Sequence, residues 1–345
     1  MFSPKYTITD KLMANIKKIT IIVQDLNGRS YPQPILYELE KQAREISAFA
    51  STSIEGNPLP LTEVKKILKS RPESIRQSEL EVLNYNQALI ELNDQLLNQP
   101  LELNLKLILS IHAKVMTNLI SEHQIGILRK APVFVNDPKV GRTIYWPPDA
   151  KDVEPLLKDL ILYLTKNKDK TDPLILAGIF HKQFVIIHPF MDGNGRTVRL
   201  AIKALLADMG LNTFHLFSFE NYYNQNVTNY FNIVGVLGNY YEIKDSIKFT
   251  AWLEYFTDGI IDELQRVKKE LEKVTPLTPE KELLPHHQTI ISYLKEKGFI
   301  KDRNYARLTN RAKATRILDF KKLMNMGIIE RLGKGKNTYY TLKTS

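Results

Sequence analysis

A polar loop between two apolar stretches constrains this chain more than any other feature. Residues 174–187 form an apolar run long enough for a buried helix. A proline follows His188 and disfavours helical geometry there, so the helix is expected to end at this histidine. A second helix, rich in Ala and Leu, is expected over 197–209. Gly193 and Gly195 lie between the two helices, and a glycine-containing loop before a helix N-terminus favours a bound anion.

The charged side chains of this loop suit a phosphate. Arg196 and Arg199 are three residues apart and share one face of the second helix, where two guanidinium groups can grip a polyphosphate. Asp192 offers hard oxygen ligands that suit Mg²⁺ bridging phosphates. His188 is the one group of the loop able to act as a base near neutral pH. Together these groups predict a site for transfer of a phosphorus group.

The stretch 188–199 resembles the signature of the Fic family, His-Pro-Phe-x-acid-Gly-Asn-Gly-Arg-x-x-Arg, and matches every specified position. Most Fic proteins with a complete signature transfer AMP from ATP to a hydroxyl side chain of a target protein. The resemblance implies that His188 deprotonates the target hydroxyl, that Asp192 holds Mg²⁺, and that Arg199 holds the γ-phosphate. It assigns the α- and β-phosphates to Gly193, Asn194, Gly195 and Arg196. Some members transfer UMP, phosphocholine or phosphate instead, and the signature leaves these donors open.

A second short pattern precedes this loop. Residues 35–54 show helical spacing of apolar residues, and Gly56 followed by a proline two residues on predicts the helix end. In the Fic family, a Ser or Thr, three residues, then Glu and Gly or Asn marks an inhibitory helix, which Ser51 and Glu55 match. The resemblance implies that Glu55 pairs with Arg199 in place of the γ-phosphate, so that ATP binds unproductively. Two alternatives stay open: an exposed residue at a helix end, and a glutamate that positions water to remove AMP from the target.

Residues 126–148 break the helical pattern. The β-prone runs 133–135 and 143–146 flank a turn containing Asn, Asp, Pro and Gly, which predicts a small hairpin. The resemblance makes this hairpin the Fic flap, which pairs through its main chain with an extended target segment. The target-docking residues are then Ile144, Tyr145 and Trp146. An ordinary surface hairpin is the alternative.

An aromatic cluster lies between residues 220 and 238. In the Fic family, a Tyr-Tyr pair on this helix borders the adenine, and the nearest counterpart in this chain is the pair Tyr230 and Phe231. An aromatic stripe packed in the core explains the same residues equally well. The two interpretations stay open.

The positive charge of the chain is concentrated at its end. Residues 281–345 hold 15 Lys and Arg against 5 Asp and Glu, a net charge of +10, whereas the rest of the chain is neutral overall. This asymmetry indicates a separate basic module and an anionic partner. Three helical stretches and two strands around a Gly-Lys-Gly-Lys turn resemble a winged helix-turn-helix, whose third helix enters a DNA major groove. Its candidate phosphate contacts are Arg311, Lys313, Arg316, Lys334 and Lys336; protein binding and an oligomer interface are the alternatives.

These patterns predict a mainly α-helical chain, a Fic-type helical bundle with a small β-hairpin flap and a C-terminal winged helix-turn-helix domain. An N-terminal helical region is expected over 1–102, with the inhibitory helix at about 35–56. The catalytic core is expected at 103–274, a proline-containing linker at 275–283 and the winged helix-like domain at 284–345.

The expected function is that of a self-inhibited protein adenylyltransferase. It uses ATP and Mg²⁺ and modifies a Ser, Thr or Tyr hydroxyl of a target protein, with the chain itself as a second substrate. The alternative is a DNA-binding transcriptional regulator with a nucleotide-sensing Fic domain, and a homo-oligomer is a further partner left open. The chain has no cysteine, no signal-peptide pattern at its start and no apolar run long enough to span a membrane, so a cytoplasmic protein without a membrane partner is expected.

Overall fold

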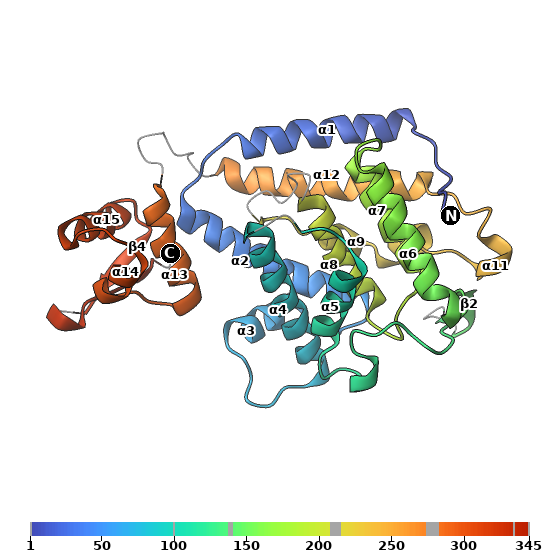
Figure 1. Ribbon diagram of the computed structural model, residues 1–345, viewed down its shortest axis with the longest axis horizontal. Helices are drawn as coiled ribbons and strands as arrows, with labels where there is room; N and C mark the ends of the chain where they lie inside the picture. Colours follow the sequence, from blue (N-terminus) through green and yellow to red (C-terminus); the bar gives the residue numbers. More distant parts are fainter. Residues whose placement is uncertain are drawn as a thin grey trace. The chain divides into compact units, whose positions relative to one another are not determined.

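The helices of the computed structural model separate into two compact units (Figure 1). The structure describes residues 2–98, 101–136, 141–207, 215–273, 283–333 and 335–343. The first unit comprises Met1–Leu26 and Gln42–Lys268, and the second comprises Asn27–Lys41 and Lys269–Ser345. Most of the expected linker at 275–283 lies outside the described residues. Within the described residues, no helix is long and apolar enough to cross a membrane.

The part of the chain up to residue 273 is almost entirely helical. Its α-helices are α1 (Asp10–Asn27), α2 (Gln33–Ile54), α3 (Leu61–Lys69), α4 (Gln77–Asn98), α5 (Leu105–Met116), α6 (Ala150–Asn167), α7 (Pro173–Ile187), α8 (Asn194–Ala207), α9 (Glu220–Gln225), α10 (Val227–Val234), α11 (Tyr240–Ile243) and α12 (Thr250–Glu272). A short 3₁₀ helix, η1, covers Glu122–Gln124. The mainly helical prediction is confirmed.

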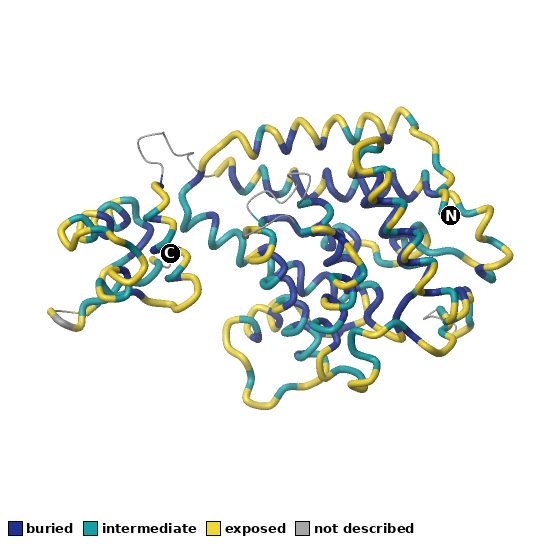
Figure 2. Tube along the Cα trace, viewed as in Figure 1, coloured by how far each residue is buried: buried dark blue, intermediate teal, exposed yellow. Residues whose placement is uncertain are grey.

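Helix α7 is the centre of the first unit. Its sequence is apolar on nearly every face, and all but two of its residues are buried. Pro173 stands at its first turn and the Asp172 side chain accepts a hydrogen bond from the Leu174 N–H, which caps its N-terminus. Helices α6 and α8 pack against it. Figure 2 shows that buried residues gather along α7 and α8, whereas α1 exposes most of one face.

The N-terminal segment belongs to the same unit as the core. Helix α1 buries an apolar stripe that includes Leu12 and Ile19. Its polar side is tied to α12, where Lys11 Nζ lies 2.8 Å from Asp258 Oδ2 and Thr9 donates to Glu254. The described residues 2–26 and 42–98 therefore belong to the same unit as the expected catalytic core, and the N-terminal helical region expected over 1–102 is largely continuous with it.

The predicted hairpin is present and acquires a third strand. Strands β1 (Val135–Asn136) and β2 (Thr143–Trp146) pair antiparallel, with Val135 opposite Tyr145. Strand β3 (Gly238–Asn239) pairs with β2 in parallel, so that β2 is the central strand. The turn residues 137–140 lie outside the described residues. Because both sides of β2 are paired, only the outer edges of β1 and β3 remain for a further strand.

The second unit contains the predicted order of three helices and a hairpin. They are α13 (Pro285–Lys297), α14 (Asp302–Leu308), α15 (Lys313–Asn325), β4 (Ile329–Leu332), the 3₁₀ helix η4 (Gly335–Asn337) and β5 (Tyr339–Leu342). Strands β4 and β5 are antiparallel, and Ile300 forms a bridge to Tyr340. Phe320 stacks on the Tyr340 ring at 4.1 Å within an apolar core. The unit thus has its own core.

A polar cluster around Asp319 ties the helices of this unit together. Arg311 donates to both carboxylate oxygens at 2.8 and 3.0 Å, and Tyr305 donates to one of them at 2.9 Å. His286 Nε2 lies 3.3 Å from the same carboxylate. Arg316 forms a second bidentate pair with Asp302 at 2.8 and 2.9 Å.

These pairs change the set of predicted phosphate contacts. The Arg311 and Arg316 guanidinium groups are committed to carboxylates of their own module, whereas Lys313 is exposed at the start of α15. Lys334 and the side chain of Lys336 lie outside the described residues.

Candidate active site

The turn after α7 places His188 in an uncommon backbone conformation. His188 has φ 52° and ψ 62°, the left-handed region that residues with a Cβ rarely adopt, and its N–H donates to Phe184 O. Its Nδ1 lies 3.3 Å from the Val185 carbonyl oxygen. Because a carbonyl only accepts, Nδ1 carries the proton and Nε2 is left as the acceptor. Burial lowers the pKa of His188, so the ring is neutral at pH 7 and can act as a base.

The loop after His188 is closed by its own asparagine. Asn194 accepts from the Phe190 N–H and donates to the Phe190 carbonyl, both at 2.9 Å. The family resemblance assigned Asn194 to a phosphate, whereas in the structure its side-chain amide is hydrogen-bonded within the loop. Gly193 has φ 75°, and a Cβ there would lie 2.5 Å from Met116 Sδ, so only glycine fits against α5.

His112 of α5 supports the same loop and was not anticipated from the sequence. Its ring stacks on Phe190 at 3.7 Å. Its Nδ1 accepts from the Gly126 N–H at 2.9 Å, so Nε2 carries the proton and donates to the Asp192 carbonyl at 3.1 Å. Burial lowers the pKa of His112 to about 4, which keeps this donor in its neutral form. A histidine inside an amphipathic helix gives no sequence signal of such a role.

The two arginines of the loop are buried and incompletely paired. Arg196 is 4% exposed and donates from Nη2 to Asp192 at 3.1 Å. Its Nε and Nη1 make no hydrogen bond, although Nη1 lies 3.9 Å from Glu81 Oε1. Arg199 is fully buried, and its Nη1 also lacks a partner. Buried donors without acceptors cost free energy, so they mark a place built to receive oxygen atoms of a ligand. These donors fit the phosphates of a nucleotide.

The remaining donors of Arg199 are held by the end of α2. Nη2 lies 2.7 Å from Glu55 Oε1 and 2.8 Å from the Ser51 carbonyl, and Nε donates to Ser51 Oγ at 2.8 Å. The Glu55 carboxylate also lies against the first turn of α8, since a Cβ at Gly195 would be 2.0 Å from Glu55 Oε1. The structure therefore brings together Arg199 and Glu55, the two residues that the family resemblance paired.

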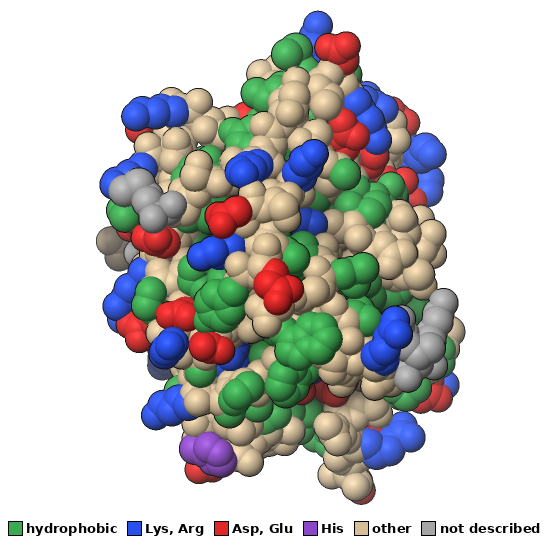
Figure 3. Space-filling view, turned by 90° about the vertical axis from the view of Figure 1, so that its right-hand side faces the viewer, with side chains coloured by type: hydrophobic (Ala, Val, Ile, Leu, Met, Phe, Trp, Pro, Cys, Tyr) green, Lys and Arg blue, Asp and Glu red, His purple; other side chains and the backbone are tan. Residues whose placement is uncertain are grey.

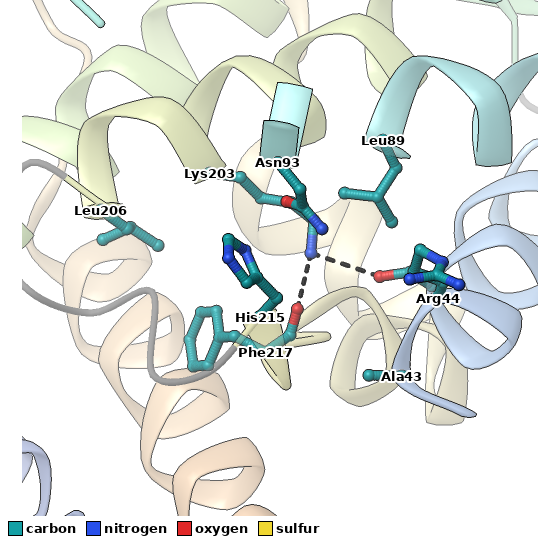
Figure 4. Close-up of a pocket in the computed structure, with 9 residues that line it drawn as sticks. Ala43, Arg44, Leu89, Asn93, Lys203, Leu206, His215 and Phe217 are labelled. Carbon is teal, nitrogen blue, oxygen red and sulfur yellow. Dashed lines mark hydrogen bonds between the residues drawn. The ribbon is translucent and has the colours of Figure 1, made fainter. Parts of the chain in front are cut away.

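A second polar contact between α2 and α8 lies one turn earlier on α2 and one turn later on α8. Lys203 Nζ donates to Ser47 Oγ at 3.2 Å and lies 3.2 Å from Glu220 Oε1. Ser47 and Ser51 on α2, like Arg199 and Lys203 on α8, are four residues apart and face each other. Figure 4 shows Lys203 donating to the Phe217 carbonyl and to α2 beside a pocket of about 10 Å³, enough for about one water molecule. Polar contacts at Ser51 and at Ser47 thus hold α2 against α8.

The flap residues separate into anchoring and exposed side chains. Tyr145 is 3% exposed and donates to the Ile186 carbonyl at 2.8 Å, so it fastens β2 to α7 and is turned away from any target. Trp146 is 40% exposed and Ile144 is partly buried. Figure 3 shows hydrophobic side chains among charged ones on the face that carries β2 and α11. Of the three predicted docking residues, Ile144 and Trp146 are accessible.

The two residues of the predicted adenine-binding pair differ in their exposure. Tyr230 is 1% exposed, stacks on Tyr223 at 4.7 Å and lies 3.0 Å from His181 Nε2 through its hydroxyl. Phe231 is 44% exposed. Tyr230 therefore matches the core interpretation, whereas Phe231 is accessible to a ligand.

Comparison with known proteins identifies the central part of the chain. Residues 102–206 match the family model described as Fic/DOC family. The chain is 33% identical over 181 residues to Protein adenylyltransferase fic-1 of Caenorhabditis elegans, covering 50% of this chain and 34% of that protein. It is 30% identical over 174 residues to Protein adenylyltransferase Fic of Nematostella vectensis, covering 49% and 39% respectively. The chain thus spans little more than a third of the length of these curated relatives.

Solved structures share the fold. A Fic family protein from Desulfovibrio desulfuricans G20 matches with a TM-score of 0.64 and 20% identity, over 100% of this chain and 99% of that one. A structure of Fic-1 from C. elegans matches with a TM-score of 0.60 and 21% identity, over 76% of this chain and 73% of that one. The family match, the complete signature and the shared fold show that residues 102–206 are a Fic/DOC family domain.

Proposed function

We propose that this chain is a protein adenylyltransferase that Glu55 holds in a self-inhibited state. The observation that carries the proposal is the 2.7 Å contact between Glu55 Oε1 and the buried Arg199, beside a complete signature loop. The name protein adenylyltransferase belongs to the curated relatives of the Fic part. Its extension to this chain rests on the side chains of the loop.

ATP fits the donors that the loop presents. The N–H groups of Arg196 and Arg199 that make no hydrogen bond, and the N-terminus of α8, favour phosphate oxygens. Asp192, whose side chain is 59% exposed, supplies a carboxylate of the kind that Mg²⁺ prefers. When bound, Mg²⁺ would neutralise charge on the phosphates. The donor set thus fits a magnesium nucleotide.

His188 supplies the base in the proposed reaction. Its unprotonated Nε2 accepts the proton of the target hydroxyl, and the hydroxyl oxygen forms a bond to the α-phosphorus. The bond between that phosphorus and the oxygen bridging to the β-phosphate breaks, so pyrophosphate leaves and AMP stays on the target. Arg196 and Arg199 stabilise the negative charge that develops on the phosphates.

Glu55 blocks this arrangement through Arg199. A γ-phosphate and the Glu55 carboxylate are both anions, and both need the same guanidinium group. Bringing them together at this buried cation costs free energy through like-charge repulsion. Glu55 therefore keeps the triphosphate out of its reactive position, and its removal is expected to raise AMP transfer.

The proposal is tested with ATP labelled at either the α- or the γ-phosphate. Wild type, Glu55→Gly, and the double variant Glu55→Gly with His188→Ala are incubated with Mg²⁺ and each ATP. Label on protein from α-labelled ATP only, strongest in Glu55→Gly and absent from the double variant, is the expected result. Label from γ-labelled ATP would show phosphate transfer, and no label from folded, ATP-binding Glu55→Gly would contradict AMP transfer.

DNA binding is a second candidate function, favoured by one feature. Residues 281–345 carry a net charge of +10 and form three helices and a hairpin, and α15 exposes Lys313 and Lys321. Binding to duplex DNA that weakens steeply with salt is expected if this module contacts phosphates. The absence of binding at low salt excludes the regulator interpretation.

A further inference from the structure

Arg129 lies between η1 and β1, and its polar groups donate to main-chain carbonyl oxygens from three parts of the chain. It is 4% exposed. Its Nε donates to His188 O at 2.7 Å, its backbone N–H donates to Pro189 O at 2.9 Å, and Nη2 lies 3.4 Å from Ile187 O. Three consecutive carbonyls of the catalytic turn are therefore held by one residue.

The same guanidinium group also holds both ends of the flap. Nη1 donates to Ala131 O at 3.2 Å, shortly before β1, and Nη2 donates to Pro148 O, shortly after β2. Arg129 thus joins both ends of the flap to the turn that carries His188. A planar guanidinium with five N–H donors can make such divergent contacts, whereas an ammonium group is a single point of charge.

The backbone that Arg129 holds needs external support. His188 has a positive φ, which is disfavoured for any residue with a Cβ, and such a conformation persists only where the surroundings over-determine it. Hydrogen bonds to the carbonyls on both sides of His188 prevent the peptide planes from rotating back. This fixes the direction in which the imidazole leaves the main chain.

We propose that Arg129 is a positioning residue that sets the geometry between the flap, which aligns the target hydroxyl, and His188, which accepts its proton. The proposal rests on the proposed function, because the flap matters only if a target hydroxyl is presented there. The hydrogen bonds of Arg129 run to the flap ends and to the turn of His188, whereas Arg196 and Arg199 are held by Asp192 and α2. Its loss should therefore impair the chemical step and spare nucleotide binding.

The experiment uses the full chain in the Glu55→Gly background. Arg129→Gln and Arg129→Lys are compared with the control Arg266→Gln, which removes an arginine that donates to the Leu216 carbonyl in the same unit, away from His188. The rate of self-labelling from α-labelled ATP at saturating ATP, the Kd for Mg-ATP and the unfolding temperature are measured for each variant.

The expected result is a split between catalysis and binding. Arg129→Gln should lower the labelling rate about 100-fold, the size that a small misplacement of reacting groups produces, while the Kd for Mg-ATP changes less than about threefold. Arg129→Lys should recover part of the rate, and Arg266→Gln should keep it. An unchanged rate in Arg129→Gln, or a loss that follows the Kd or equals that of the control, overturns the proposal.

A second readout separates this proposal from the proposed function. If the parent Glu55→Gly chain takes up no label, AMP transfer fails, and the His188 ring resonances in the NMR spectrum of Arg129→Lys then decide. A shifted or exchange-broadened His188 ring, with an unchanged His112 ring, shows that Arg129 positions the histidine. Unchanged His188 resonances reject that role, whatever reaction the site performs.

Discussion

The arginines of the Fic domain and those of the C-terminal unit differ in how their donors are used. Arg196 and Arg199 are buried and retain N–H groups without hydrogen-bond partners. Arg311 and Arg316 are more exposed, and each forms a bidentate pair with a carboxylate of its own unit. The density of positive charge in the sequence favours the second region as the anion-binding one. The geometry favours the first, because a ligand gains most from donors that folding has left unpaired.

The largest expected effect comes from replacing Arg196 of the Fic domain, with Arg316 of the C-terminal unit replaced as the control. In the Glu55→Gly background, Arg196→Gln should weaken Mg-ATP binding or AMP transfer about 100-fold, because two charge-assisted hydrogen bonds are lost. Arg316→Gln, its matched control, should change either quantity less than about twofold. Titration with Mg-ATP and initial rates from α-labelled ATP measure both effects. Equal losses of Mg-ATP binding or AMP transfer in the two variants would show that the unpaired donors of Arg196 matter no more than the paired donors of Arg316.

A smaller effect is expected from removing only the charge of Glu55. Glu55→Gln keeps the size of the side chain but exchanges a charge-assisted hydrogen bond with Arg199 for a neutral one. AMP transfer should rise about tenfold above wild type and stay below that of Glu55→Gly. The control Glu73→Gln alters an exposed glutamate in the segment between α3 and α4 and should leave the rate unchanged. Wild-type activity in Glu55→Gln would show that bulk, and not charge, restrains the site.

The pH dependence of transfer should report the environment of His188. Burial lowers the pKa of this base in the folded chain below its usual 6.5, so the ring stays neutral, and able to accept a proton, to lower pH. In Glu55→Gly, initial rates measured between about pH 5 and pH 8 should therefore begin to fall only below about pH 6.5. An acid limb centred above that value contradicts a buried base.

The smallest effect concerns the stability of the C-terminal unit. Burial lowers the pKa of His287 to about 4, so its folded form favours the neutral ring. Its contribution is fully present above the unfolded pKa of about 6.5 and is lost as pH falls from there toward about 4, because the unfolded chain takes up the proton first. The hydrogen-exchange protection factors of the α13 amides, which are corrected for the intrinsic pH dependence of exchange, should fall over this range in wild type and less so in His287→Gln. An identical fall of the protection factors in both would assign the effect to other groups.

The local parts of the site could be predicted from the sequence. The apolar run, the proline after His188 and the two glycines predict helix, turn and helix, because each acts within a few residues. The pairing of Glu55 with Arg199 came from family resemblance, and the structure places the two groups in contact. Inhibition by that contact stays a prediction.

The parts that depend on distant residues could not be predicted in the same way. Arg129 acts on carbonyls 59 residues away, and nothing in its neighbourhood distinguishes it from a surface arginine. Tyr145 was expected to be a docking residue because the hairpin resembles the Fic flap, but Tyr145 pairs with β3 and is buried against α7. Arg311 and Arg316 suggested contacts with DNA, and their pairing with Asp319 and Asp302 is visible only in three dimensions.

Gly195 has a consequence for how this chain can change by mutation. The space beside its Cα receives the Glu55 carboxylate, and any Cβ there would collide with it. A larger residue would expel Glu55, but it would also occupy the entrance of the proposed phosphate site at the start of α8. If Glu55 restrains AMP transfer as proposed, substitutions at Gly195 cannot release the enzyme, and gain-of-activity variants should gather at residues 51–55. Loss-of-activity variants should gather at residues 188–199. A single genetic screen for both kinds of variant would then locate the inhibitory residues and the catalytic residues in two separate segments.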